Sequence, residues 1–189
     1  MDAIELLTTR SSTSKLQSPA PSDEHWRIIQ QAAVRAPDHA NLKPWQFIVF
    51  KTQEQRAALG QLYVKAAKLA DENVEQAVLD KAAGLAFRAP LVVACIAKYS
   101  EHPKVPRVEQ VITAGCSVMA MQQAAFVLGY GGIWRTGSYA HNPHMKDLLG
   151  LDEQDEIVGY LYLGTPSSDV AIKPQKPIDE FFIDYQIKP

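Results

Sequence analysis

The sequence has no excess of charge of either sign, and this balance limits the partners that the protein can bind. Its 189 residues include 19 lysines and arginines against 21 aspartates and glutamates, which gives a formal net charge of -2. Broad binding to nucleic acid or to an anionic membrane needs a basic face. We therefore expect no nucleic-acid partner, although the balance leaves room for a local basic pocket that holds one phosphate.

The sequence also lacks long apolar runs and paired cysteines. Residues 1–7 carry acidic side chains and no basic region before an apolar core, so we expect no signal peptide. The most apolar stretch, 111–130, is interrupted by two glutamines and is interpreted as a buried helix rather than a membrane span. Cys95 and Cys116 form no CxxC pair, which indicates reduced, buried thiols. These features predict a cytoplasmic protein without membrane contact.

The familiar catalytic motifs are absent as well. The sequence contains no GxSxG, GxxxxGK[ST] or HExxH motif, and no GxGxxG follows the first expected strand. His141 and His144 have a spacing that could suit a metal, but no third ligand lies near them in the sequence, and we expect no metal site. Without a side-chain nucleophile or a metal, a bound cofactor is the expected source of any chemistry.

The patterns that are present predict one mixed α/β domain over residues 1–189. Caps, apolar periodicity and stop residues predict helices over about 2–9, 22–35, 53–70, 74–87, 108–128 and 143–149. Strands are predicted over 44–50, 91–97, 131–135 and 157–163. The continuous apolar run at 91–97 is typical of a central strand covered on both faces. Because the strands are separated by helices, we expect a central sheet sandwiched by helices.

The last segment, about 166–189, differs from the rest of the chain. It combines four prolines with the aromatic residues Phe181, Phe182 and Tyr185. It is too rich in proline for a helix and too aromatic for a free tail. We expect an extended arm that packs on another surface, and a partner subunit is one candidate.

Three polar segments carry residues suited to an anionic ligand. The segment 10–12 (Arg-Ser-Ser) follows the first helix and can hold a phosphate through its guanidinium, hydroxyls and backbone N–H groups. The loop 35–45 combines a helix stop, polar side chains and two prolines before a strand. The turn 129–138 places glycines around Trp134 and a cation. The alternatives are a solvated linker, a capped surface turn and a helix-to-strand turn with Trp134 in the core.

Together these segments resemble the nitroreductase family of flavoproteins, over nearly the whole chain and in the right order. Pro37–Trp45 matches the family pattern Pro-Ser-x-x-Asn-x-Gln-Pro-Trp, and Arg10–Ser12 matches its Arg-x-Ser entry after the first helix. Gly132–Arg135 and Leu163–Pro166 match later signatures. The resemblance is closest to the short, minimal members. It implies a three-layer sandwich with a central, mostly antiparallel sheet, in a homodimer whose interface is formed largely by the helix at 108–128.

The resemblance also implies FMN at two sites in the dimer interface. The residues that the match places at the flavin are Arg10, Ser11, Ser12, Arg35, His39, Trp134, Arg135 and Thr136. Arg10 and Ser12 would bind the phosphate and ribityl end with Ser11 beside them, and the residues at 134–136 would line the flavin. Arg35 and His39 would reach the flavin of the other subunit. No catalytic side chain is implied, since the flavin carries the chemistry.

The sequence departs from the family pattern at positions that bear on the flavin. Ser14, followed by Lys15, stands where the family has a second basic residue, Asp38 replaces the first serine of the loop, and Lys43 replaces its glutamine. The hydrogen bonds to the flavin ring are therefore expected to differ from the usual set. The chain also has no room for a long helical excursion over the pocket, which predicts a more open site and a broad or unusual substrate range.

The implied activity is ping-pong hydride transfer. NAD(P)H would reduce the flavin at N5, and a nitroaromatic, a quinone or a similar electron-poor small molecule would then be reduced. One alternative is another flavin chemistry on the same scaffold, such as dehalogenation, azoline oxidation or flavin destruction. The others are a non-enzymatic FMN binder and a helical interaction module without cofactor.

Overall fold

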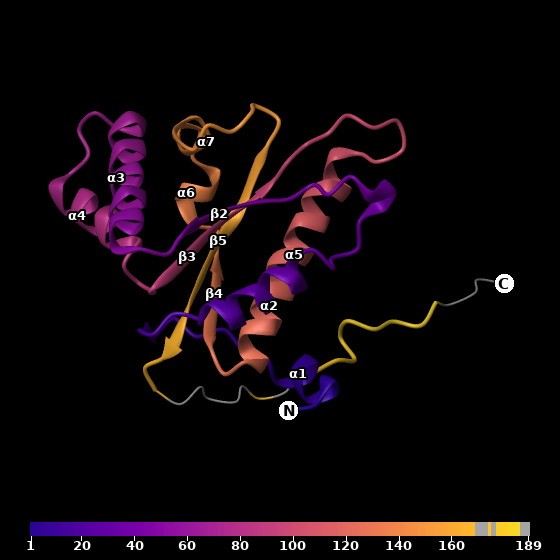
Figure 1. The fold of residues 1–189 in the computed structure, drawn as a ribbon. Helices are drawn as coiled ribbons and strands as arrows, with labels where there is room; N and C mark the ends of the chain where they lie inside the picture. The colour runs from indigo at the N-terminus through magenta and orange to yellow at the C-terminus, as the bar shows by residue number, and fades with distance from the viewer. Residues whose placement is uncertain (169–173, 175–176, 186–189) are drawn as a thin grey trace.

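The computed structural model describes residues 1–168, 174 and 177–185, which form three layers with the sheet in the middle (Figure 1). The helices are α1 Ala3–Thr9, α2 Asp23–Ala33, α3 Gln53–Ala70, α4 Gln76–Leu85, α5 Arg107–Val127, α6 Gly137–His141 and α7 Pro143–Leu148, with a 3-10 turn at His39–Asn41. The strands are β1 Leu16–Gln17, β2 Gln46–Phe50, β3 Leu91–Ala97, β4 Gly131–Arg135 and β5 Glu156–Pro166. Figure 1 shows α3, α4, α6 and α7 on one face of the sheet and α2 and α5 on the other.

Helices α1, α2 and α3 each begin at a side chain that satisfies a free backbone N–H group. The Asp2 carboxylate accepts a hydrogen bond from the backbone of α1, and the Ser22 hydroxyl does the same for α2. Thr52 and Gln55 form a reciprocal capping box at the start of α3. Because these caps are local, the starts of α1, α2 and α3 were predictable from the sequence.

All the strand pairs in the sheet are antiparallel. The order is β1-β5-β3-β2, and β4 pairs with β5 as well. Every residue of β3 is buried, which confirms the central strand predicted at 91–97. Side chains point alternately to the two faces of a strand, so Val92 and Ala94 enter one core while Leu91 and Val93 enter the other. The predicted fold class, a central antiparallel sheet flanked by helices, is confirmed.

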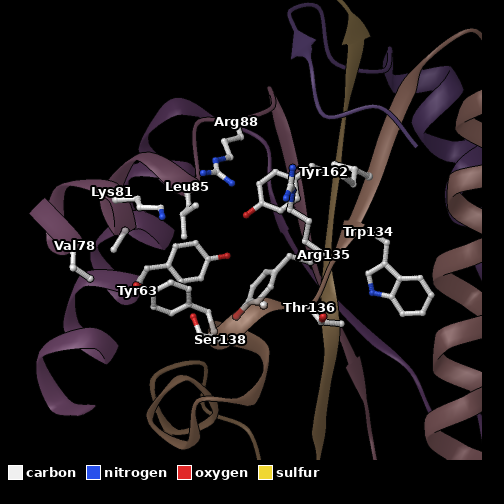
Figure 2. Close-up of a pocket in the computed structure, with 15 residues that line it drawn as sticks. Tyr63, Val78, Lys81, Leu85, Arg88, Trp134, Arg135, Thr136, Ser138 and Tyr162 are labelled. Carbon is white, nitrogen blue, oxygen red and sulfur yellow. The ribbon is translucent and has the colours of Figure 1, made fainter. Parts of the chain in front are cut away.

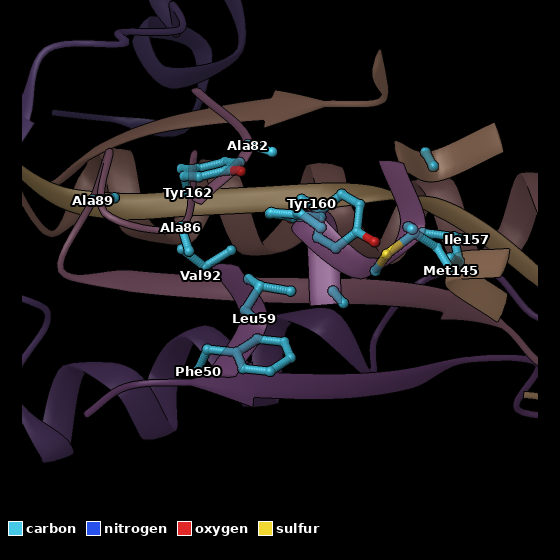
Figure 3. Packing of buried hydrophobic residues seen from close by; sticks show 14 of the residues in the cluster. Phe50, Leu59, Ala82, Ala86, Ala89, Val92, Met145, Ile157, Tyr160 and Tyr162 are labelled. Carbon is cyan, nitrogen blue, oxygen red and sulfur yellow. The ribbon is translucent and has the colours of Figure 1, made fainter. Parts of the chain in front are cut away.

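The two cores have different compositions. The core between the sheet and α2 and α5 is largely aliphatic and includes Ile29, Val118 and Leu161. The core on the α3 and α4 face, part of which is drawn in Figure 3, also contains Tyr160 and Tyr162 from β5. Phenol rings therefore line the sheet face that is covered by α3, α4, α6 and α7.

The structure differs from the sequence expectations mainly in short elements. β1, the 3-10 turn and α6 were not predicted, because segments of two to five residues carry no periodicity. β5 extends three residues past the predicted end, since its last residues Thr165 and Pro166 pair with β1. β2 starts at Gln46 rather than at Pro44, following Lys43, whose φ of 52° is left-handed. Pairing across the fold, rather than local pattern, sets these boundaries.

The predicted C-terminal arm over 166–189 lies partly outside the described residues. Residues 177–185 contain neither a helix nor a strand. Phe181, Phe182 and Tyr185 are each more than 70% exposed in a single subunit. The packing of the arm on a partner subunit stays a prediction.

Helix α5 packs one side on the sheet and leaves the other side open. Ala114 and Val118 are buried against the sheet, whereas Val108, Ile112 and Met119 are 49–60% exposed. The helix is thus apolar on two sides but covered on only one within the subunit. Within the described part of the chain, neither α5 nor any other helix has the length and apolar character to cross a membrane.

Trp134 fixes the position of β4 between α5 and β5. Its indole N–H donates a hydrogen bond of 2.9 Å to the Val158 carbonyl. The strand register shifts where β5 passes Gly159, and this glycine has a φ of 141°. A Cβ at Gly159 would lie 2.3 Å from the indole nitrogen, and one at Gly115 on α5 would lie 3.3 Å from the ring. The two glycines make room for the indole.

We predict that Gly159→Ala lowers the free energy of unfolding by about 2–4 kcal/mol, because alanine adds steric overlap to an unfavourable backbone conformation. Urea denaturation measures the change. The matched control is Gly84→Ala on α4, where an added Cβ meets nothing within 4 Å. This control should gain about 0.5–1 kcal/mol, as expected for a helical glycine. Equal effects of the two substitutions would contradict the role assigned to Gly159.

Candidate functional site

Most of the predicted site residues lie along β4 or beside it. Within β4, Trp134 points toward α5, and Arg135 therefore lies on the opposite face of the strand. The segment that carries Arg10, Ser11 and Ser12 runs past the beginning of the same strand. There the Thr13 N–H donates a hydrogen bond of 3.1 Å to the Gly132 carbonyl.

Arg10 has an unpaired hydrogen-bond donor at this position. Its Nη1 atom is buried and has no partner among the described residues. Ser11, the next residue, is also buried. Leaving a buried polar group unpaired costs about 1–3 kcal/mol, and more when the group is charged. A bound anion would supply the missing acceptor, so the surroundings of Arg10 fit a phosphate group.

Gln122 of α5 holds the Arg10–Ser12 segment against β4. Its buried side-chain amide donates to the Ser12 hydroxyl at 3.1 Å and to the Gly132 carbonyl at 2.9 Å. The sequence analysis treated this glutamine only as an interruption of an apolar run. A polar residue inside a buried helix was the signal that could have identified it, since buried amides need partners.

A cavity of about 510 Å³ opens at the far end of β4, on the α3 and α4 face of the sheet (Figure 2). Its walls come from α3, α4, β4, β5 and α6, and from the segment between α4 and β3. The lining residues are Tyr63, Val78, Lys81, Ala82, Leu85, Arg88, Ile133, Trp134, Arg135, Thr136, Gly137, Ser138, Tyr139, Tyr160 and Tyr162. The structure thus places the predicted residues 134–136 at the wall of this cavity, while the Trp134 indole itself points toward α5.

Tyrosine side chains form the back of the cavity. Tyr63 and Tyr160 pack edge-to-face with ring centroids 5.4 Å apart, and the Tyr139 ring lies 4.5 Å from that of Tyr63. The Tyr63 and Tyr160 hydroxyls are buried, and no residue in the described part of the chain hydrogen-bonds to them. Burial raises the pKa of both phenols above the usual value for tyrosine. Both therefore stay protonated and can donate hydrogen bonds to a ligand.

Two arginines act on Tyr162 in the same cavity. Burial raises the pKa of Tyr162, while the charges of Arg88 and Arg135 act in the opposite direction. Figure 2 shows these two guanidinium groups on opposite sides of the phenol, one from the α4 side and one from β4. The mouth of the cavity is consequently positive.

The loop at 37–45 is held in an unusual conformation. Ala40, Asn41 and Lys43 have left-handed φ values between 52° and 62°. Such a conformation costs a non-glycine residue about 1–2 kcal/mol. The Asp38 carboxylate compensates by accepting hydrogen bonds from the backbone N–H groups of Leu42 and Lys43, at 3.1 and 2.7 Å. The aspartate that departs from the family pattern therefore shapes this loop.

The structure does not bring all the predicted site residues together within one subunit. His39 Nδ1 lies 2.8 Å from the carboxylate of Glu109, near the start of α5, and Arg35 is exposed at the end of α2. Ser12 contacts Gln122, near the other end of α5. A rise of roughly 1.5 Å per residue puts Glu109 and Gln122 about 20 Å apart along the helix. His39 and Ser12 thus lie near opposite ends of α5, and Trp134 packs near its middle.

The sequence analysis missed most of the walls of the cavity. Tyr63 and Lys81 fell within the helices predicted over 53–70 and 74–87 and were given no role, and Arg88 was not considered. Tyr160 and Tyr162 offered a signal, because they occupy alternate positions in an otherwise aliphatic strand and so face the same side.

Comparison with known proteins agrees with this architecture. The family model described as Nitroreductase family matches residues 7–165. The chain belongs to the nitroreductase family. It is 43% identical over 185 residues to YdjA of Escherichia coli (strain K12), a NAD(P)H nitroreductase by its name, with 98% of this chain and 100% of YdjA covered. A relative from Haemophilus influenzae with the same description is 37% identical over 166 residues, covering 87% of this chain and 89% of its own.

Solved structures of more distant family members share the fold. A nitroreductase-like protein from Bacillus cereus superposes with a TM-score of 0.82 at 18% identity, covering 98% of this chain and 97% of its own. A nitroreductase from Desulfovibrio desulfuricans, solved in complex with FMN, has a TM-score of 0.72 at 19% identity, with coverages of 98% and 97%. The nitroreductase fold expected from the sequence is confirmed, and the protein is an enzyme of an oxidoreductase family.

We predict that Gln122→Met lowers the free energy of unfolding by about 1–3 kcal/mol, because Ser12 and the Gly132 carbonyl lose a buried donor. Methionine preserves the length of the side chain, so packing changes little. Gln61→Met, at an exposed position of α3, serves as the control and should be neutral within about 0.5 kcal/mol. Chemical denaturation compares the two variants, and a neutral Gln122→Met would show that the amide does not hold the segment.

Proposed function

We propose that the protein is an FMN-dependent oxidoreductase, which transfers a hydride from NAD(P)H to a nitroaromatic, a quinone or a similar electron-poor small molecule in ping-pong order. Membership of the nitroreductase family supports the reaction class. The observation that carries the cofactor assignment is the buried Nη1 of Arg10, which has no partner among the described residues. It lies beside Ser11 in the segment that runs past the beginning of β4, and the other end of β4 lines the tyrosine cavity.

The residues present fit a ligand that joins a phosphate to a flat, electron-accepting ring. Arg10 would bind the phosphate with Ser11 and Ser12, and Trp134, Arg135 and Thr136 would lie along the ring. FMN supplies two-electron chemistry at N5 when it is bound. Arg135 would hold a positive charge beside the ring, and such a charge would favour the anionic reduced form of a bound flavin. No catalytic side chain is required.

We also infer a homodimer in which each flavin site draws on both subunits. The open side of α5 carries Val108, Ile112 and Met119, and a second copy of α5 is a suitable cover for it. The midpoint between Glu109 and Gln122 falls at Gly115–Cys116. A two-fold axis near this midpoint would place the Glu109 end of one α5, beside which His39 lies, next to the Gln122 end of the partner's α5. The Arg10–Ser12 segment of the partner lies at that end.

The first test is the visible spectrum of the purified protein, followed by anaerobic addition of NADH and then NADPH. We expect flavin absorption bands that bleach with at least one donor and return when a quinone or nitroaromatic is added. Bands that persist with both donors would contradict the proposed reductase and indicate a flavin carrier. A protein that binds no FMN would contradict the cofactor assignment itself.

A mixed dimer tests whether the site is shared. Arg10→Ala and His39→Ala should each weaken FMN binding by about 1.5–3 kcal/mol, since each removes a hydrogen-bonding partner of a charged ligand. If the two residues serve one flavin from different subunits, a dimer of one Arg10→Ala and one His39→Ala subunit keeps one intact site. Titration of the tagged, purified heterodimer should then recover half of the normal high-affinity FMN stoichiometry.

Arg27→Ala, at an exposed position of α2, is the control and should leave both FMN sites intact. A heterodimer with no high-affinity FMN site would contradict the shared arrangement, because it would place both residues in the same subunit's site. Sedimentation of each variant checks that the dimer itself is preserved.

A further inference from the structure

The contact between His39 and Glu109 lies at the end of α5 that the proposed homodimer brings to the partner's flavin. We infer that Glu109 is a positioning residue of this site: its carboxylate fixes a proton on Nδ1 of His39 and turns Nε2 toward that flavin. The inference rests on the proposed function, because it concerns the same site. It gives a role to a residue outside the segments that resemble the family pattern.

The carboxylate determines which ring nitrogen of His39 carries a proton. His39 Nδ1 lies 2.8 Å from Glu109 Oε2. An ionised carboxylate only accepts hydrogen bonds, so Nδ1 must hold a proton and donate it. The ring meets this condition both when it is neutral and when it is doubly protonated, and in both states Nε2 is left for another partner. No residue in the described part of the chain hydrogen-bonds to Nε2.

The start of α5 makes the Glu109 carboxylate available for this contact. Glu109 lies in the first turn of the helix, where the helix dipole favours a negative charge. Arg107, the cation in the same turn, is engaged elsewhere. Its guanidinium donates to the Gln154 carbonyl at 3.2 Å and pairs with the carboxylate of Glu156. The Glu109 carboxylate is thus left to His39.

The backbone around His39 restricts the ring from the other side. Ala40 and Asn41 follow it with left-handed φ values of 62° and 55°. The Asp38 carboxylate holds the loop in this shape by accepting hydrogen bonds from two backbone N–H groups farther along it. A fixed backbone and the contact with Glu109 together orient the imidazole before a ligand arrives, which lowers the entropy lost on binding.

The exposure of the two side chains favours a role in ligand binding over a role in folding. In a single subunit the His39 side chain is 55% exposed and that of Glu109 is 44% exposed. Even a charged pair contributes little to the free energy of folding at such exposure, because water and salt screen it. The contact does give Nε2 a fixed direction. We therefore expect Glu109→Gln to fold and dimerise normally.

Nitrogen NMR on FMN-saturated protein labelled at histidine locates the proton. The His39 signal is assigned by its absence in His39→Ala. At a pH where the ring is neutral, we expect the proton on Nδ1. Glu109→Gln should move roughly half or more of the population to the Nε2–H tautomer, because the glutamine amide can donate to Nδ1. Glu24→Gln, which removes the same charge from the first turn of α2, is the control and should leave the signal unchanged.

A double-mutant cycle separates positioning from a general effect on the structure. Glu109→Gln should weaken FMN binding about three- to tenfold in the otherwise unchanged protein. The same substitution made in His39→Ala protein should change the affinity by less than about twofold, because Glu109 acts through the imidazole. Glu24→Gln should leave the affinity unchanged in both backgrounds. Sedimentation and thermal unfolding of each variant check the dimer and the fold.

Three outcomes would each overturn the inference. The first is a His39 proton that stays on Nδ1 in Glu109→Gln, and the second is unchanged FMN affinity in that variant. The third is a loss of affinity that persists in His39→Ala protein, since Glu109 would then act without the imidazole. Where the wild-type protein binds FMN that NAD(P)H bleaches, these outcomes reject the inference alone. A wild-type protein that binds no FMN rejects the proposed function, and the inference with it.

Discussion

The position of the Trp134 indole against Gly159 is the constraint on which the site depends. Because side chains alternate along a strand, packing the indole on the α5 side commits Arg135 to the opposite side, where it lines the tyrosine cavity. The shift of register beside Cys95 and the positive φ of Gly159 are the backbone features that accommodate the ring. A larger residue at Gly159 would displace Trp134 and with it the end of β4.

The same strand connects the two halves of the proposed flavin site. At its beginning, the Gly132 carbonyl accepts hydrogen bonds from the Thr13 N–H and the Gln122 side-chain amide. These bonds set the position of the Arg10–Ser12 segment. At its end, Arg135 opens onto the cavity. The groups near His39 lie at the far end of α5, and in the proposed homodimer a second subunit would bring them to this site.

Three buried polar atoms that have no hydrogen-bond partner within residues 1–168, 174 and 177–185 lie at the proposed ligand positions. Arg10 Nη1 stands at the expected phosphate, and the Tyr63 and Tyr160 hydroxyls line the cavity. The protein tolerates their desolvation cost in the unbound subunit, and bound ligands can offset it. Ligand binding should therefore stabilise the fold more than the contact area alone suggests.

The sequence by itself determined the capped helices, the buried central strand and the family, because each depends on local chemistry. The caps at Asp2, Ser22 and Thr52 and the apolar run at 91–97 are readable without knowledge of any contact. Only the tertiary structure decided how β1 and β5 pair, which side of β4 faces the cavity, and that tyrosines and cations from α3, α4 and β5 meet there. Those features depend on residues far apart in the chain, and the hydrophobic pattern that places them in a helix or strand does not specify which segments will face each other.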